Sequence, residues 1–115
     1  MTIYEICHAA LSPLGLPLAA VMMKPGKGQT YPDRYLVYQL ISAPPEAHAD
    51  DLETERTYLV QVNAWSRNGF IGFPDIEAAM LAAGFRYSSQ RDLPFSTETG
   101  HSGLSLDFFY LENRS

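Results

Sequence analysis

The residues best suited to chemistry in this 115-residue chain are grouped between positions 48 and 53. His48, Asp50, Asp51 and Glu53 supply one imidazole and three carboxylates, and oxygen-rich loops of this kind can hold Ca²⁺. The acids do not stand at the offsets of an EF-hand loop, and the central glycine of such a loop is missing. We therefore expect a solvated acidic loop and no metal-binding residues.

Nucleophilic catalysis requires a serine, cysteine or similar group next to a base. His8, His48 and His101 lie in separate predicted elements, and no serine stands in the glycine-flanked turn that exposes a hydrolase nucleophile. Cys7 falls on the apolar stripe of the first predicted helix, where a free cysteine is usually buried and unreactive. The sequence therefore predicts no catalytic residue and no enzymatic activity.

Phosphate recognition is also poorly supported. The segment Gly26-Lys27-Gly28 lacks the spacing of a P-loop, and no predicted helix follows it. The formal net charge is −5 and the pI is about 5.0, whereas nucleic-acid binding needs clustered Lys and Arg. Lys24, Lys27 and Arg34 are the nearest approach to such a cluster. We therefore expect neither a bound cofactor nor direct nucleic-acid recognition.

Cysteine content and hydropathy suggest where the chain works. Cys7 is the single cysteine, so no internal disulfide can form, and a reducing compartment follows most simply. No run of about 18 apolar residues is present, and the first residues lack the basic and apolar regions of a secretory signal. We expect a soluble, intracellular protein that does not enter a membrane.

Local sequence signals predict two helices. Thr2 and Glu5 form a capping box that starts the first helix, and Pro13 ends it. Pro74 at the first helical position and Gly84 after the last turn mark a second helix over about 74–83. Strands are expected where apolar residues alternate or run together, at 18–23, 35–42, 56–65, 85–89 and 104–111.

The order of these elements is helix, three strands, helix, two strands, with no strand-helix-strand repeat. The sequence therefore predicts one α+β domain over residues 1–115, with an antiparallel or mixed sheet of about five strands and two helices packed on one face. Exposed loops are expected at about 24–34, 43–55 and 90–103 because these segments are rich in Pro, Gly or polar residues.

Trp65 lies on the mixed face of the 56–65 strand, close to Arg67. A half-buried tryptophan next to an arginine is typical of contact surfaces. Trp65 could equally cover the edge of the core, because tryptophan is usually largely buried.

The segment 58–67, Tyr-Leu-Val-Gln-Val-Asn-Ala-Trp-Ser-Arg, resembles the tail-completion proteins of tailed bacteriophages, also called tail terminators or head-to-tail joining proteins. The order of the other motifs is similar: an N-terminal helix, a Leu-Gly-Leu-Pro turn at 14–17, a Tyr-x-x-Tyr strand at 35–38 and an Ala-Gly-Phe helix end at 83–85. Asn63 stands where the family has aspartate, and the segment 69–73 is unusually apolar for its place.

This resemblance implies a structural virion component that forms a sixfold ring at the head-proximal end of the tail. Its partners would be further copies of itself, the tail-tube protein and the head connector, in the virion tail and, during assembly, in the bacterial cytoplasm. A ring uses two different patches on each subunit. The charge asymmetry between the loops suggests that the 24–34 loop and the 65–73 segment are the donor patches and that the acidic 46–55 loop is the acceptor patch. The interface residues expected on these segments are Lys24, Lys27, Arg34, Asp50, Asp51, Glu53, Trp65, Arg67, Phe70 and Phe73.

Two other functions remain open at this stage. The chain could be a small bacterial binding or regulatory module that uses the sheet face opposite the helices. It could also be an enzyme with an acid-base pair drawn from His48 or His101 and nearby carboxylates.

Overall fold

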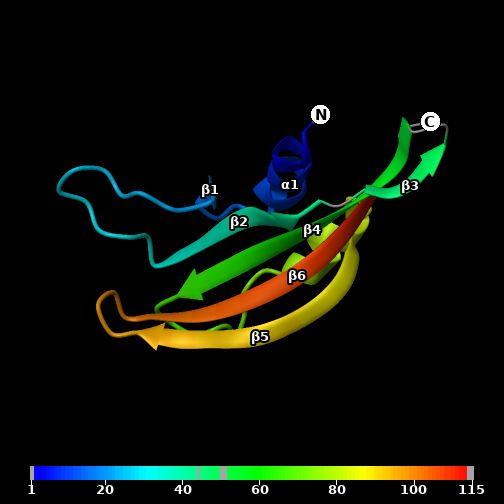
Figure 1. Cartoon of the computed structure of the whole chain (residues 1–115). Helices are drawn as coiled ribbons and strands as arrows, with labels where there is room; N and C mark the ends of the chain where they lie inside the picture. Colours follow the sequence, from blue (N-terminus) through cyan, green and yellow to red (C-terminus); the bar gives the residue numbers. More distant parts are fainter. Residues whose placement is uncertain (1, 44, 50–51, 114–115) are drawn as a thin grey trace.

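The computed structural model describes residues 2–43, 45–49 and 52–113, and over these residues the chain is an α+β fold (Figure 1). The described strands form one mixed sheet in the order β1-β2-β4-β6-β5, and β3 pairs separately with β4. Both α-helices pack on the same face of this sheet. The predicted fold class is therefore confirmed, with β3 as an additional strand.

Helix α1 (Ile3–Leu11) begins as the sequence predicts. The Thr2 hydroxyl accepts a hydrogen bond from the Glu5 backbone N–H at 3.2 Å, and the Glu5 carboxylate accepts one from the Thr2 N–H at 2.8 Å. This reciprocal pair satisfies two of the donors that a helix start leaves free. A short 3-10 helix, η1 (Ser12–Leu14), follows and carries Pro13 in its first turn.

The centre of the sheet consists of three long antiparallel neighbours: β2 (Arg34–Ser42), β4 (Leu52–Ser66) and β6 (His101–Asn113). Alternate residues of β4, from Tyr58 to Ala64, are buried against the helices, as their period of two predicts. The core cluster contains the residues Ile3, Cys7, Ala10, Leu11, Leu36, Tyr38, Tyr58, Val60, Val62, Ala64, Ile76, Met80, Phe85, Leu106 and Phe108. The opposite face of the sheet has no helix over it among the described residues.

Strand β1 (Leu18–Ala20) is shorter than the predicted strand 18–23. It pairs in parallel with β2, and the chain turns away at Val21, whose φ is +69°. The Met22 N–H donates to the Ala20 carbonyl at 2.8 Å, which is the pattern of a γ-turn. Residues 21–33 then form an irregular loop, as expected for most of 24–34, while Arg34 already belongs to β2.

Helix α2 (Ile76–Ala82) is also shorter than predicted. Asp75 is its N-cap and accepts a hydrogen bond from the Ala78 N–H at 3.0 Å, so Pro74 precedes the helix instead of opening it. Gly84 follows the helix with φ of +97°, the left-handed conformation for which glycine is suited.

Two segments expected to be loops are largely strands. Strand β3 (Pro45–Ala49) pairs antiparallel with the start of β4, so most of the described residues in the predicted 43–55 loop belong to strands. Strand β5 (Arg86–Ser96) runs antiparallel to β6 through most of the predicted 90–103 loop, and a tight turn at 97–100 joins them. Because β5 is an exposed edge strand, it tolerates polar residues and Pro94, which obscured its pattern in the sequence.

Candidate functional site

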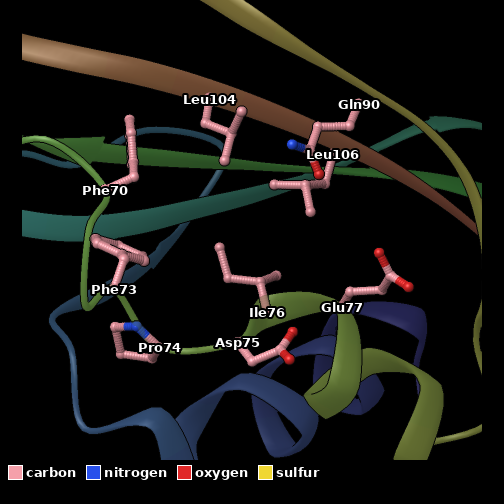
Figure 2. A pocket seen from close by; sticks show the side chains of 9 residues that line it. All are labelled: Phe70, Phe73, Pro74, Asp75, Ile76, Glu77, Gln90, Leu104 and Leu106. Atoms are coloured by element: carbon pink, nitrogen blue, oxygen red, sulfur yellow. The ribbon is translucent and has the colours of Figure 1, made fainter.

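A pocket of about 310 Å³ opens between α2, the loop before it, the middle of β5 and the first half of β6 (Figure 2). Its apolar floor comes from the loop, the first turn of α2 and two alternate residues of β6. Carboxylates and one amide lie around this floor. The lining residues are Phe70, Phe73, Pro74, Asp75, Ile76, Glu77, Gln90, Leu104 and Leu106.

The loop that carries the two phenylalanines is held in place by a β-turn. The Phe73 N–H donates to the Phe70 carbonyl at 3.1 Å, and Gly72 has φ of +76°, as the third residue of a type II turn requires. The rings of Phe70 and Phe73 meet edge to face with centroids 5.1 Å apart and pack against the core. The Arg34 guanidinium lies 5.6 Å from the centre of the Phe73 ring.

This pocket is suited to binding an apolar group, and its rim favours a positive charge. Asp75 already uses one oxygen to cap α2, while Glu77 is exposed and has no ion pair among the described residues. None of the nine lining residues is a histidine, cysteine, serine or lysine. The pocket therefore offers apolar contacts and two carboxylates, those of Asp75 and Glu77.

A second hollow, of about 230 Å³, lies on the sheet face opposite the helices. Its lining residues are Val21, Met22, Met23, Tyr31, Tyr35, Val37, Asn63 and Trp65. Val21 and Met22 leave 57% of their surface exposed, which is unusual for two adjacent apolar residues. Asn63 Oδ1 is buried in this region and makes no hydrogen bond within the described residues.

Beside this hollow, a row of hydrogen bonds crosses four strands. The Gln39 amide donates to Gln61 Oε1 at 3.0 Å, and the Gln61 amide donates to Asp107 Oδ1 at 3.4 Å. Ser89 donates to the other Asp107 oxygen at 3.0 Å, and Arg91 lies 3.8 Å from that oxygen. These groups are already partnered, so the middle of the open face is less available to a ligand than its two ends.

The structure brings together only some of the predicted interface residues. Arg34, Phe70 and Phe73 form one cluster at the pocket. Lys24 and Lys27 are exposed in the 21–33 loop and have no ion pair within the described residues.

The predicted acidic partner surface cannot be placed from the structure. Asp50 and Asp51 lie outside the described residues. Glu53 belongs to β4, where its backbone is opposite that of His48.

Arg67 has an internal role that the sequence did not reveal, and Trp65 also makes a contact within the chain. The Arg67 guanidinium pairs with Asp33 at 2.7 Å and donates to the Thr99 carbonyl at 2.9 Å, so it ties two loops together. Trp65 lies over Gly103, where an added Cβ would be 2.5 Å from the indole ring. A glycine beneath a cross-strand aromatic ring is a recognised device in sheets, and Gly103 was the available signal for it.

His101 is completely buried. Its Nε2 donates to the Pro32 carbonyl at 2.8 Å, and its Nδ1 lies 2.7 Å from the Thr99 hydroxyl. The ring also meets Tyr35 edge to face, with centroids 5.2 Å apart. Both nitrogens of His101 are thus engaged in joining the 21–33 loop to the β5–β6 turn, and neither contacts a carboxylate.

The other candidate groups are also engaged or buried. His8 Nδ1 lies 3.1 Å from the Tyr38 hydroxyl. Cys7 is buried as predicted, and burial raises the pKa of its thiol to about 12, so the reactive thiolate is disfavoured at neutral pH. Among the described residues, no three His, Cys, Asp or Glu side chains gather in a way that could hold a metal ion.

The sequence did not predict that Ile71 is exposed, although the 69–73 segment is unusually apolar for its place. Ile71 occupies the second position of the β-turn between the two phenylalanines, and its relative exposure is 103%. The glycines on either side, Gly69 and Gly72, both have φ of +76°. An apolar residue between two glycines in a loop was the signal available in the sequence.

Comparison with known proteins does not assign this fold and pocket to a family: no family model matches the chain, and no curated protein matches it. Within the described residues, neither helix combines the length and the apolar character needed to cross a membrane.

Proposed function

We propose that this chain is a tail-completion protein of a phage or prophage, which forms a ring at the head-proximal end of the tail and joins the tail to the head connector. In this role it acts by protein–protein contact and not as an enzyme. The order of motifs around Trp65 resembles that family, and the described helices and strands follow one another in the order of those motifs.

The observation that carries the proposal is the amount of apolar surface exposed at separate places on the molecule. Ile71, Val21, Met22 and Phe95 each expose more than half of their surface. Exposed apolar side chains that gather at a hollow mark protein contact sites. Two different apolar surfaces on one chain favour head-to-tail association. Such association forms a ring when the rotation between successive subunits closes on itself.

Electron microscopy of the purified protein, alone and mixed with phage tail tubes, tests this proposal. We expect closed rings of uniform diameter, or density at one end of each tube. Light scattering over a range of protein concentrations gives the mass of the ring. A protein that neither forms rings nor binds either end of any tail tube, including tubes from its own phage or prophage, would contradict the proposal.

A second candidate function, a small binding or regulatory module, is favoured by the hollow on the open face. Its walls are aromatic and apolar, and the unpaired Asn63 Oδ1 is an acceptor that a ligand N–H or O–H could satisfy. Because Trp65 lines the hollow and is the only tryptophan, its fluorescence reports occupancy. A saturable fluorescence change with a small-molecule library, in a protein that stays monomeric, would favour this function over the first.

A further inference from the structure

Ile71 is exposed in a loop whose flanking residues, Phe70 and Phe73, pack against the core. Phe70 and Phe73 anchor the β-turn against the core on the helix side of the sheet, and Gly72 supplies the positive φ that the turn needs. The Ile71 side chain is fully exposed between them. Because partly buried anchors hold this turn, its backbone loses little further freedom when a partner buries Ile71.

The hollow lined by Val21, Met22 and Trp65 is the complementary feature. It lies on the open side of the sheet, so Ile71 and the hollow belong to different faces of the molecule. Its volume of about 230 Å³ is ample for one isoleucine side chain, and most of its walls are apolar or aromatic. The buried Asn63 Oδ1 lacks a donor, while the N–H groups of Ile71 and Gly72 donate no hydrogen bond within the described residues.

Carboxylates lie next to the first of these features and lysines next to the second, although the Arg34 guanidinium also lies beside the Phe73 ring. Asp75 and Glu77 follow the Ile71 turn and lie on the rim of the pocket in Figure 2. Lys24 and Lys27 follow Met23 in the loop that borders the hollow, and they are exposed without an ion pair among the described residues. When the apolar parts meet, the acidic rim of one copy can therefore face the basic loop of the other, which steers their orientation.

We infer that Ile71 of one copy inserts into the hollow formed by Val21, Met22, Met23 and Trp65 of a second copy, with Asp75 and Glu77 facing Lys24 and Lys27. The contact uses two different patches, so each copy can give and receive it, and repetition generates a ring or a filament. This inference rests on the proposed function, since it names the subunit contact of the ring. It differs from the sequence-based expectation, in which the 46–55 loop would receive the basic loop.

Disulfide trapping between two differently labelled copies tests the contact directly. Protein carrying Ile71→Cys is mixed with protein carrying Met22→Cys, and a mild oxidant is added. We expect a covalent dimer that contains one copy of each variant, in clear excess over the dimers formed by either variant alone. Wild type controls for Cys7, whose thiol is buried, and Leu81→Cys replaces Ile71→Cys as an exposed apolar position on α2 outside the contact.

Three substitutions add a quantitative readout. Ile71→Asp should weaken self-association by about 10- to 100-fold, the effect of failing to bury one large aliphatic side chain, while the unfolding midpoint stays the same because Ile71 is exposed. Glu77→Lys should weaken association and make its salt dependence smaller. Adding Lys24→Glu to the Glu77→Lys protein should restore part of the lost association.

The outcomes separate the contact from the function. Trapping at Ile71 above the Leu81 control, together with the charge-reversal rescue, supports the inference. If rings form but trapping at Ile71 does not exceed the control, the inference about the contact is wrong and the proposed ring function stands. A chain that neither traps nor associates at any concentration, in solution or on tail tubes, overturns both.

Discussion

Val21 is a β-branched residue with φ of +69°, and its replacement tests whether the rim of the hollow is strained. Left-handed backbone conformation brings Cβ close to the following carbonyl, and β-branched residues are real outliers there. The perturbation is a pair of variants, Val21→Ala and Val21→Gly. Both remove the exposed valine side chain and keep the Val21 N–H, which donates to the Tyr38 carbonyl at 2.8 Å.

The expected difference between these variants can be worked from two opposing effects. Relief of the left-handed conformation favours glycine over alanine by about 1 to 2 kcal/mol. The greater freedom of glycine in the unfolded chain opposes this by about 0.5 to 1 kcal/mol. Val21→Gly should therefore be more stable than Val21→Ala by about 0.7 kcal/mol, or about 3 °C in Tm for a domain of this size.

Urea unfolding of both variants, followed by circular dichroism, provides the measurement. The matched control is the neighbouring residue in β1: Ala20 does not have a positive φ, so Ala20→Gly should destabilise by about 0.5 to 1 kcal/mol. The difference in unfolding free energy between glycine and alanine is therefore expected to have opposite signs at positions 20 and 21. If glycine is as unfavourable at position 21 as at position 20, the argument that Val21 is strained is wrong.

Three further predictions concern the interior. Gly103→Ala should cost about 1 to 3 kcal/mol of unfolding free energy and shift the emission of Trp65, since the new methyl would overlap the indole; equal stability of variant and wild type would refute this. His101→Phe should lower the free energy of unfolding by about 3 kcal/mol, measured by thermal unfolding, because the Pro32 carbonyl loses the N–H that His101 donates to it. A loss below about 1 kcal/mol would contradict this and show that water supplies the missing donor. The raised pKa of Cys7 predicts that stability falls as pH rises from about 8.5, where the unfolded thiol ionises, towards 12; the urea midpoint should decline less steeply in Cys7→Ala, and identical slopes would contradict the burial effect.

The sequence predicts best those elements whose signals are local and strong. The Thr2–Glu5 capping box, the alternation along 58–64 and the glycine at position 84 each require only nearby residues, and each is found in the structure. The helix order and the packing on one sheet face follow from them. Buried Cys7 was predicted for the same reason, since it lies on the apolar stripe of α1.

The missed features depend on contacts between distant residues. The role of Arg67 requires Asp33 and Thr99, and that of His101 requires Pro32. The second part of β5, residues 90–96, was missed because an exposed edge strand needs no apolar alternation when a neighbour such as β6 supplies its hydrogen bonds. Neither kind of contact leaves a pattern within one short window of sequence.

The same distant contacts explain why the two proposed contact surfaces are pre-organised. The loop that borders the hollow is held by the Arg67–Asp33 pair and by the bond from His101 to Pro32, while the Ile71 turn is held by its two phenylalanine anchors. Between these ends, the side chains in the row from Gln39 to Asp107 already bond to one another. Association at the ends would thus require little reordering of either loop, which lowers the entropy cost of forming a ring from small interfaces. It follows that loosening an anchor away from the contact, for example with Arg67→Met, should weaken self-association even though Arg67 is not part of the proposed contact.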